Sequence, residues 1–405
     1  MVYANATWPD RAKMNIALII ERFDIALGGA ERSVRQIAEQ LEAMGHRTTI
    51  LASVAPAAAP GVTALCGHQS RERVPFSRYR AALEAHLKTA DYDIIHSTLP
   101  FDGADLYQPR GGSYAQAALR SAAAYPNPLI TLFKRATGLA NSRRRQYIRA
   151  ERQLCSGSTV LIAALSDYVK RQFQRRYHLP DQRIALTPGG VKIPLPIDPD
   201  QAGHCERQVI SALQADRSQA TVLLFAANNF RLKGLHDLLN AMSVFKQRMP
   251  SHRLVLIVAG SGKQRPFRRL AARLNIDSDV YFAGYTDAVE NYLAICDAAV
   301  LPTYYDPCSR FILEALALTK PVLTTRYNGA AEVYQHLRHG IILDEPNPIE
   351  PFVHGLTALS QPENRRHMSE AIRQDGLTQA VSIENHCTAL INLYQSIYNQ
   401  KHKTV

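Results

Sequence analysis

The 405-residue sequence predicts an α/β protein in which two parallel-sheet domains face each other across a cleft. Short apolar strands alternate with amphipathic helices along most of the chain, and this alternation is typical of parallel βαβ units. It stops once, in the proline-rich stretch VKIPLPIDPDQAG that begins at Val191, and then starts again. Because proline and glycine interrupt both helix and strand patterns, this stretch indicates a linker. We therefore expect two Rossmann-like domains, each long enough to bury its own core.

The first domain is expected over residues 14–190, after a loose tail over residues 1–13. Its strands are predicted, in chain order, at MNIALIIERFD, RTTILAS, YDIIHSTL, ADLYQP, TVLIAALS and RIALTPGGV. A glycine-rich turn that leads into a helix is predicted in IALGGAERSVRQIAEQLEAMGH, and further helices in LITLFKRATGLANSRRRQYIRAERQLCSGS and DYVKRQFQRRYH.

The second domain is expected over residues 191–380. Its strands are predicted at TVLLFAAN, RLVLIVAG, VYFAGY, AAVLPTY and PVLTT, and its helices at GLHDLLNAMSVFKQR, KQRPFRRLAARLN, AVENYLAIC and CSRFILEALAL. Residues 381–405 contain IENHCTALINLYQSIYNQ, which predicts a terminal helix that packs back toward the first domain.

The composition is that of an ordinary globular protein, with 46% hydrophobic and 20% charged residues. No run of eighteen apolar residues is present, and the first residues carry no pattern of a secretory signal. The six cysteines are scattered without a CxxC pair, which argues against a disulfide framework or a zinc site. These features predict a cytoplasmic protein.

The positive charge is concentrated in one part of the chain. The net charge is +12, and residues 134–183 alone hold twelve basic and three acidic residues. Such a segment favours an anionic partner, for example phospholipid headgroups, a phosphorylated glycolipid or nucleic acid. A solvated helix face without a partner is the alternative interpretation.

The stretch DPCSRFILEALA follows a predicted strand and contains a candidate phosphate site. Ligands of open parallel sheets bind at the carboxyl ends of the strands. We expect a helix to begin near Pro307 or Cys308, because proline suits a first helical turn. The N–H groups of that turn would point into the cleft, where the helix dipole favours a phosphate. These N–H groups belong to Ser309, Arg310 and Phe311.

Two carboxylates flank this phosphate site. Glu314 lies one to two turns into the helix, where it could accept two ribose hydroxyls, and Asp306 lies in the loop before the helix. An aspartate N-cap and a solvated glutamate would explain the same spacing without a ligand.

Two further loops carry candidate residues. Arg231 and Lys233 precede a helix of the second domain and could neutralise a diphosphate. Gly28 and Gly29 would let the backbone approach a ligand closely, although a plain βα turn has the same pattern. No acidic residue ends the next strand, so the pattern does not indicate an NAD site.

The strand ends of the first domain offer three more side chains. His96 ends DIIH and is a candidate base or hydrogen-bond donor, although a lone histidine is more often structural. Arg110 precedes two glycines at another strand end, where it would contact an anion or an acceptor. Asp105, at the start of the same segment, is also expected to contact the acceptor.

Taken together, these stretches resemble a known family. DPCSRFILEALALTKPVLTT, FRLKG, the GSG after LVLIVA, and LGGAER resemble the retaining family 4 glycosyltransferases of the GT-B fold. The resemblance extends over nearly the whole chain after residue 13. The carboxylate pair matches the E-x7-E motif of that family, with Asp306 in place of the first Glu. DLYQPRGGSY, YIRAERQL and YYDPCSRFILEALA are similar to stretches of the bacterial lipopolysaccharide-core glucosyltransferase type.

The resemblance implies roles for the candidate residues. Glu314 would bind the donor ribose, and Lys233 with Arg231 would balance the charge of the leaving diphosphate. Asp306 would contact the transferred sugar. The glycines at 28–29 would pack against the donor.

The resemblance also assigns the remaining residues and the two domains. Glu31 would contact the donor or the acceptor, and the catalytic set would be Asp306, Lys233 and His96. Many family members carry a histidine where Arg110 stands here, which is a departure from the family pattern. The first domain would bind the acceptor, and the second would bind the nucleotide-sugar donor.

The expected function is therefore transfer of a hexose with retention of configuration. The donor would be UDP-glucose or a similar nucleotide sugar, and the acceptor a hydroxyl of a lipid-linked saccharide such as lipopolysaccharide core. No metal ion and no cofactor are expected. The basic residues 134–183 would hold the protein peripherally on the inner face of the cell membrane.

Two alternatives belong to other classes. A sugar-nucleotide epimerase of the same domain plan would convert the donor without any acceptor. A basic nucleic-acid-binding protein is disfavoured, because no recognised nucleic-acid module is present, and no nucleic-acid partner is expected.

Overall fold

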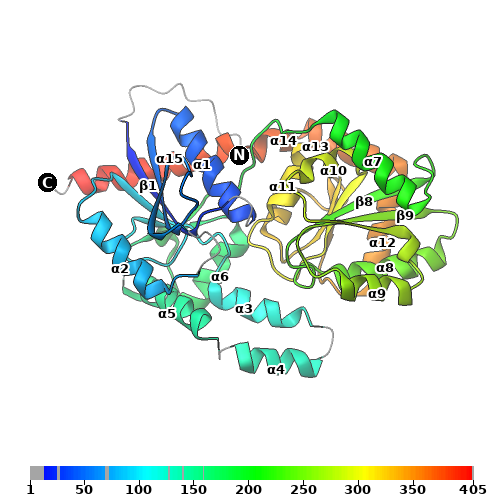
Figure 1. The fold of residues 1–405 in the computed structure, drawn as a ribbon, viewed down its shortest axis with the longest axis horizontal. Coiled ribbons are helices and arrows are strands. Elements are labelled where there is room, and N and C mark those ends of the chain that lie inside the picture. Colours follow the sequence, from blue (N-terminus) through cyan, green and yellow to red (C-terminus); the bar gives the residue numbers. More distant parts are fainter. Residues whose placement is uncertain are drawn as a thin grey trace.

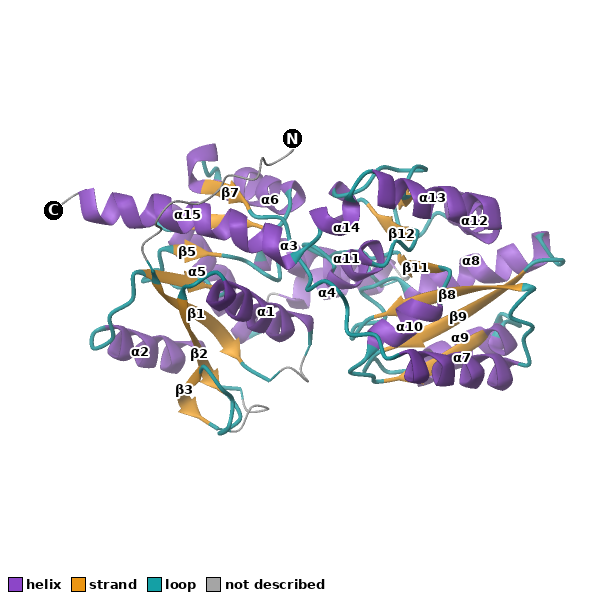
Figure 2. Cartoon of the chain, turned by 90° about the horizontal axis from the view of Figure 1, so that it is seen from above, coloured by secondary structure: helices purple, strands orange, loops and turns teal. Residues whose placement is uncertain are grey.

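The computed structural model consists of two α/β lobes that lie side by side (Figures 1 and 2). It describes residues 13–24, 28–68, 73–125, 128–138, 141–157 and 159–403. The expected N-terminal tail lies outside the described residues except for Lys13. Each lobe contains one parallel sheet, so the predicted fold class is confirmed.

The first lobe is built on a seven-stranded sheet of order β3-β2-β1-β4-β5-β6-β7, and all of its strand pairs are parallel. The strands are β1 (Asn15–Arg22), β2 (Arg47–Val54), β3 (Val62–Gly67), β4 (Ile94–Ser97), β5 (Leu106–Tyr107), β6 (Leu161–Ala164) and β7 (Ile184–Leu186). The central strands read as apolar runs because helices cover both faces of a parallel sheet.

The helices of the first lobe lie on the two faces of this sheet. They are α1 (Gly29–Ala43), α2 (Phe76–Leu87), α3 (Tyr114–Ala123), α4 (Pro128–Gly138), α5 (Ser142–Gly157) and α6 (Asp167–Tyr177). Buried side chains of α1, such as Ile37 and Leu41, pack on one face. Tyr79 of α2 and Tyr147 of α5 pack on the other.

The second lobe has a six-stranded sheet of order β10-β9-β8-β11-β12-β13, again with parallel pairs throughout. Its strands are β8 (Ala220–Ala226), β9 (Arg253–Ala259), β10 (Val280–Gly284), β11 (Ala298–Leu301), β12 (Val322–Thr325) and β13 (Gly340–Leu343). Its helices are α7 (Pro199–Leu213), α8 (Leu235–Arg248), α9 (Arg265–Arg273), α10 (Val289–Ile295), α11 (Arg310–Ala317), α12 (Ile349–Ser360), α13 (Pro362–Gln374) and α14 (Leu377–Ala380).

The chain crosses between the lobes twice at the same place. Val191, at the start of the linker, donates its N–H to the carbonyl of Val381 and accepts from the N–H of Ile383. Helix α15 (Ile383–Lys403) then runs back across the first lobe (Figure 1), where Leu390 and Tyr394 join the core beside α1. The C-terminal helix therefore belongs to the core of the first lobe.

Three elements of the first lobe, β3, α2 and α3, were not predicted from the sequence. β3 is an edge strand whose residues are all partly exposed, so its sequence shows neither a buried run nor a strict alternation. α2 has a weakly separated apolar face, with only Phe76, Tyr79 and Leu83 buried. Among the described residues, no helix is both long and apolar enough to span a bilayer.

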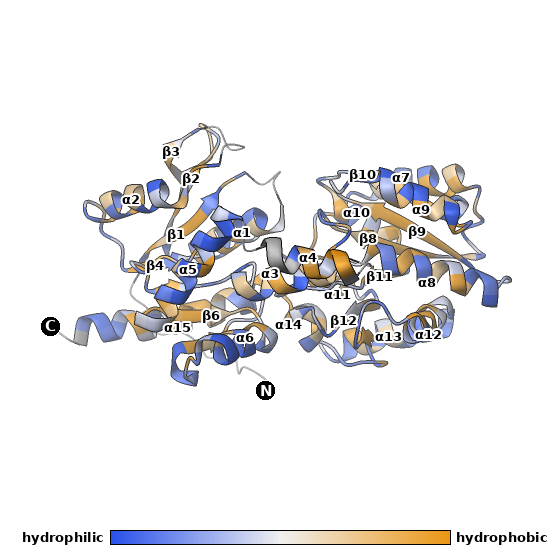
Figure 3. Ribbon diagram, turned by 90° about the horizontal axis from the view of Figure 1, so that it is seen from below, coloured by the Kyte–Doolittle hydropathy of each residue, from blue (hydrophilic) through white to orange (hydrophobic). Residues whose placement is uncertain are grey.

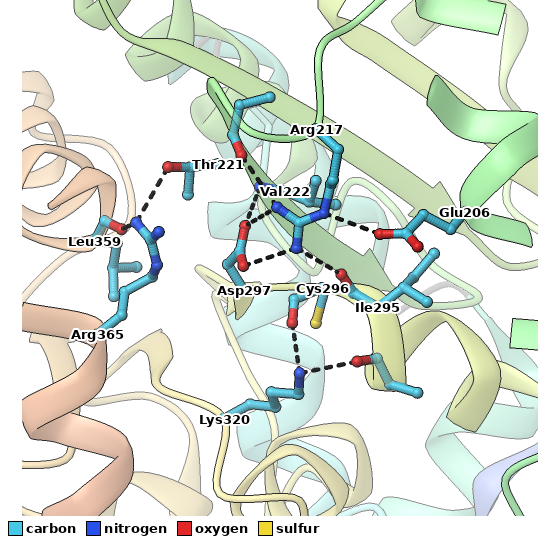
Figure 4. Close-up of polar contacts among 12 residues, drawn as sticks. Glu206, Arg217, Thr221, Val222, Ile295, Cys296, Asp297, Lys320, Leu359 and Arg365 are labelled. Atoms are coloured by element: carbon cyan, nitrogen blue, oxygen red, sulfur yellow. Dashed lines mark hydrogen bonds and ion pairs between the residues drawn. The ribbon is translucent and has the colours of Figure 1, made fainter. Parts of the chain in front are cut away.

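The amino edge of the second sheet is closed by a network of ion pairs (Figure 4). Arg217 contacts both oxygens of Asp297 at 2.9 and 3.1 Å, and Asp297 also accepts the N–H of Val222 at 2.7 Å. Lys320 donates to the carbonyls of Ala294 and Cys296. Since these charged groups have protein partners, the network stabilises this edge of the sheet.

Candidate active site

A pocket of about 320 Å³ lies between the two lobes. In each sheet the strand order reverses once, between β1 and β4 in the first lobe and between β8 and β11 in the second. Loops at the carboxyl ends of strands separate at such a reversal and leave a crevice. The loops after β1, β8 and β11 all contribute to the pocket, through Gly28, Lys233 and Asp306 among others. The structure thus brings together loops that are about 280 residues apart in sequence.

Lys233 and Asp306 form an ion pair in the wall of this pocket. The Lys233 Nζ lies 2.5 Å from an Asp306 Oδ2 and 3.0 Å from the carbonyl oxygen of Tyr305. Gly234 follows with φ +79, and a Cβ there would lie 2.0 Å from the carbonyl oxygen of Pro302. Glycine is therefore needed to turn the chain into α8 and hold Lys233 against the loop after β11.

The helix after that loop begins later than predicted. α11 starts at Arg310, with Ser309 as its N-cap, instead of near Pro307. The Ser309 N–H donates to Asn328 Oδ1 at 3.0 Å and is not available to a ligand, so this part of the prediction is wrong. Arg310 and Phe311 line the pocket with the first N–H groups of the helix, and these groups have no intrahelical acceptor. The N-terminus of α11 therefore offers two backbone N–H donors to a ligand, those of Arg310 and Phe311.

Glu314 lies one turn into α11 and is almost fully buried at the pocket. Arg310 Nε donates to its Oε1 at 2.6 Å, and Arg310 also reaches Gln36 of the first lobe at 2.8 Å. Burial raises the pKa of the Glu314 carboxyl, and the neighbouring Arg310 opposes that shift. The carboxylate is thus held on one side by an arginine and faces the pocket.

Gly28 and Gly29 bring α1 of the first lobe close to the second lobe. A Cβ at Gly28 would lie 3.5 Å from Asn228 Nδ2, and one at Gly29 would lie 3.7 Å from the Arg310 side chain. Both glycines line the pocket. Glu31, in the first turn of α1, lies just outside the pocket lining, and burial raises its pKa.

Arg110 is a pocket residue with a fixed position. Its guanidinium donates to Gln108 Oε1 at 2.9 Å and to Ser33 Oγ, and it lines the pocket from the loop after β5. Burial lowers its pKa to about 10, and the like charge of Arg310 contributes to the shift. The predicted position at the cleft agrees with the structure.

His96 does not face the pocket. It lies within β4, is 2% exposed, and its Nδ1 is 2.6 Å from the Tyr394 hydroxyl of α15. Burial, with the positive charge of Arg110, lowers its pKa to about 3. The sequence placed His96 at a strand end, but its side chain points to the face covered by α15. It is therefore not positioned as a base.

Asp105 is also outside the pocket. It precedes β5, so it lies at the amino edge of the sheet, opposite the edge that bears the pocket. Its carboxylate accepts the N–H of Ile95 at 2.8 Å and pairs with Lys401 of α15 at 2.7 Å. These contacts give Asp105 a structural role in place of the predicted acceptor contact.

Arg231 points away from the donor side of its loop. Its guanidinium carbon lies 3.5 Å from the centre of the Tyr125 ring, in a stacked cation–π contact with the first lobe. It is absent from the residues that line the pocket, whereas Lys233 lines it. The two basic residues, which the sequence grouped as a pair, therefore have different surroundings.

Several pocket residues were not identified from the sequence. They are Arg32, Ser33, Asn228, Tyr285 and Thr286. The GSG turn that begins at Gly260 could have pointed to this part of the pocket. Gly260 has φ +126, and a Cβ there would lie 1.9 Å from the carbonyl oxygen of Ala227, so the position requires glycine. Within the described residues, no three His, Cys, Asp or Glu side chains gather in a way that could hold a metal ion.

Each lobe matches a glycosyltransferase family. Residues 27–193 match the family described as Glycosyltransferase Family 4, and residues 207–375 match the family described as Glycosyl transferases group 1. The chain belongs to these glycosyltransferases. The resemblance drawn from the sequence motifs is thus confirmed, and so is the enzyme class that it implied, glycosyltransferase.

Similarity to known proteins extends over nearly the whole chain. The lipopolysaccharide glucosyltransferase WaaG of Escherichia coli is 25% identical over 361 residues, which cover 87% of this chain and 91% of WaaG. The crystal structure of WaaG superimposes with a TM-score of 0.72 at 24% identity, covering 93% and 99% of the two chains. The Anabaena protein HepE, solved in complex with UDP and glucose, gives a TM-score of 0.67 at 16% identity, covering 95% and 100%. These likenesses establish the GT-B fold for this glycosyltransferase.

Proposed function

We propose that this glycosyltransferase moves glucose from UDP-glucose to a hydroxyl of a lipid-linked saccharide, such as lipopolysaccharide core, with retention of configuration. The observation that carries the proposal is the single pocket that holds Lys233, Asp306, Glu314 and the N-terminus of α11. The relatives support the choice of substrates, because WaaG is named a lipopolysaccharide glucosyltransferase and HepE was crystallised with UDP and glucose.

The donor would lie across the pocket with its charged groups at the second lobe. The N–H groups of Arg310 and Phe311 would bind a phosphate at the positive end of α11. Glu314 would accept hydrogen bonds from the ribose hydroxyls. Gly28 and Gly29 line the pocket without side chains and would leave room for the diphosphate beside α1.

The chemical step requires stabilisation of the charge that develops on the leaving diphosphate. Lys233 is the side chain placed for this task, because it reaches into the pocket beside the N-terminus of α11. Asp306 holds Lys233 and would contact the hydroxyls of the transferred sugar. Fixed cations aimed at a developing charge need no reorganisation during the reaction, and this preorganisation lowers the barrier. Protein cations thereby take the role that a metal ion has in other transferases.

The acceptor would enter from the first lobe. Arg110 lies in the pocket on that side and is held by Gln108 and Ser33, so it is placed to contact an anionic or hydroxyl-rich saccharide. His96 is not assigned the role of base. The departing phosphate itself would take the proton of the acceptor hydroxyl.

The lipid-linked acceptor places the enzyme at a membrane surface. Helices α3 and α4 lie below the junction of the two lobes in Figure 1, and the ribbon of α4 is largely coloured as hydrophobic in Figure 3. Leu129, Leu132 and Phe133 are 74%, 66% and 61% exposed. The basic helix α5 follows directly in the chain. An exposed apolar helix beside positive charge fits the interface of an anionic membrane.

The proposed function is tested by incubating the enzyme with UDP-glucose and lipopolysaccharide that ends before the glucose position. We expect a glucose to be added, and proton NMR of the product should show the same anomeric configuration as in the donor. Conversion of UDP-glucose to another nucleotide sugar without any acceptor would instead support the epimerase alternative. Inversion at the anomeric carbon would contradict the proposed mechanism.

A further inference from the structure

A second, larger cavity lies entirely within the first lobe. It has a volume of about 620 Å³ and is formed by α3, α5 and α6, which lie together on the lower side of the lobe in Figure 1. Four of its residues are arginines, namely Arg152, Arg171, Arg175 and Arg176; the others are Gln116, Tyr168, Gln172 and Tyr177. None of the described residues that line it is acidic. The cavity therefore carries a concentrated positive charge.

Most of this charge is not neutralised by the protein. Arg171 pairs with Asp167 and, at 3.2 Å, with Glu332. For the other three arginines, no carboxylate of the described chain lies within ion-pair distance. Exposed arginines are common on protein surfaces, so their number alone does not make a site. A second observation comes from the wall of the cavity.

Gln172, one of the residues in the wall of the cavity, has a side-chain donor without a partner in the described chain. The residue is 8% exposed, and its Oε1 accepts from the Tyr305 hydroxyl at 2.9 Å and from the Ser113 N–H at 3.4 Å. These two donors fix which end of the amide is oxygen. The Nε2 on the other side is buried and has no partner in the described chain. A buried amide donor is costly to leave unpaired, so an acceptor atom that reached this amide from the cavity would be stabilised.

The ligand class follows from these two features. Arginine guanidinium groups bind the oxygens of phosphate in a forked geometry, and a buried amide adds a directed donor to the same oxygens. The cavity also lies next to the active site in the chain. Tyr305, whose hydroxyl donates to Gln172, is followed in the chain by Asp306 of the donor pocket.

We propose that the cavity between α3, α5 and α6 binds a phosphate group carried by the acceptor saccharide. This inference rests on the proposed function, because it assumes a saccharide acceptor. The phosphate would fix the acceptor on the first lobe while its reacting hydroxyl extends past the loop at residues 304–307 to the donor. Part of the basic segment 134–183 would then serve substrate recognition, while the remainder faces the membrane.

The test compares two double variants that remove the same charge. In Arg175→Gln/Arg176→Gln the lost arginines line the cavity, and in Arg145→Gln/Arg149→Gln they lie on the exposed face of α5 outside it. The probe is a delipidated core oligosaccharide, used as isolated and after phosphatase treatment. Calorimetry without UDP-glucose measures its binding, so the result does not depend on turnover.

We expect wild-type enzyme to bind the phosphorylated oligosaccharide at least about tenfold more tightly than the treated one, as expected for charge-assisted hydrogen bonds. The cavity variant should lose this preference and the control should keep it. Gln172→Glu retains acceptors for Tyr305 but replaces the amide donor with a carboxylate, so it should also lose the preference. In transfer assays, the KM for the phosphorylated acceptor should rise while kcat stays near the wild-type value.

Three results would overturn the proposal. The first is equal binding of both oligosaccharides by the wild-type enzyme. The second is the same loss of affinity in the two double variants, which would indicate unspecific charge attraction. The third is a cavity variant that loses binding only to phosphatidylglycerol vesicles, which would assign the phosphate to a lipid headgroup. Loss of selective binding in a protein that transfers no glucose would support the cavity and contradict the proposed function.

Discussion

At the scale of single residues, Lys233 and Arg231 belong to the same loop but have different surroundings. Both are basic and lie two residues apart, but Lys233 pairs with Asp306 in the pocket, whereas Arg231 stacks on Tyr125 of the first lobe. Sequence spacing cannot distinguish them, because the direction of each side chain depends on the other lobe. The structure therefore shows Lys233 in the pocket and Arg231 in a contact between the lobes, and the proposed role toward the leaving diphosphate falls to Lys233.

Lys233→Ala tests this assignment. Removal of the cation that faces the leaving diphosphate should lower kcat by about 100-fold or more, as is typical for loss of a group that stabilises the transition state. Steady-state transfer assays with saturating donor measure the effect. Arg231→Ala is the matched control, and its kcat should fall far less. Equal losses of kcat in the two variants would show that the loop acts as a unit.

Two of the buried histidines, His96 of β4 and His386 of α15, predict how stability depends on pH. His96 and His386 are both held neutral by burial near Arg110, and each pKa is lowered to about 3. An unfolded histidine binds a proton below about pH 6.5. Between pH 6.5 and 3 the unfolded chain therefore binds more protons than the folded chain, and the free energy of unfolding falls as the pH falls.

Each histidine contributes up to about 1.4 kcal/mol per pH unit in that window. Thermal unfolding between pH 4.5 and 8 should accordingly show a shallower decline of Tm toward acid in His96→Asn/His386→Asn than in the wild type. Parallel curves for the two proteins would show that the histidines are not neutral in the folded state.

At the scale of elements, the predicted helices and strands differ from the structure where tertiary contacts set their limits. The strands of the sheet centres were predicted well, because burial on both faces leaves apolar runs such as Ile16–Ile20. The edge strand β3 was missed because it lacks that burial. Helix α11 begins at Arg310 because Asn328, far along the chain, takes the Ser309 N–H. Local propensity cannot anticipate such a partner.

We predict that helix α4 contacts the membrane surface. Replacement of Leu132 by Asp puts a charge on an apolar surface that is 66% exposed, and it should weaken binding to phosphatidylglycerol vesicles by about tenfold or more. Leu337→Asp is the control, because Leu337 is 64% exposed on the other lobe. Vesicle co-sedimentation measures both. Unchanged binding of Leu132→Asp would remove α4 from the membrane contact.

At the scale of the whole molecule, the site exists only because two sheets face each other at their carboxyl edges. The alternation of strands and helices was enough to predict two Rossmann-like lobes, and the loops that follow strands were enough to place Lys233, Asp306 and Glu314 in one cleft. The terminal helix was expected to pack back toward the first domain, and α15 does so. The sequence could not show that Tyr394 of this helix bonds His96 and turns it away from the cleft. That contact joins residues 298 apart in the chain.

The most direct test of the central claim is the calorimetric binding of UDP, GDP, ADP and their hexose derivatives to the wild type and to Glu314→Ala. We expect UDP and UDP-glucose to bind the wild type and to lose at least about tenfold in affinity when the buried carboxylate is removed, since two hydrogen bonds to a charged group are lost. Melting curves would show that the variant is folded. If no nucleotide binds, or if Glu314→Ala binds as tightly as the wild type, the pocket between the lobes is not the donor site.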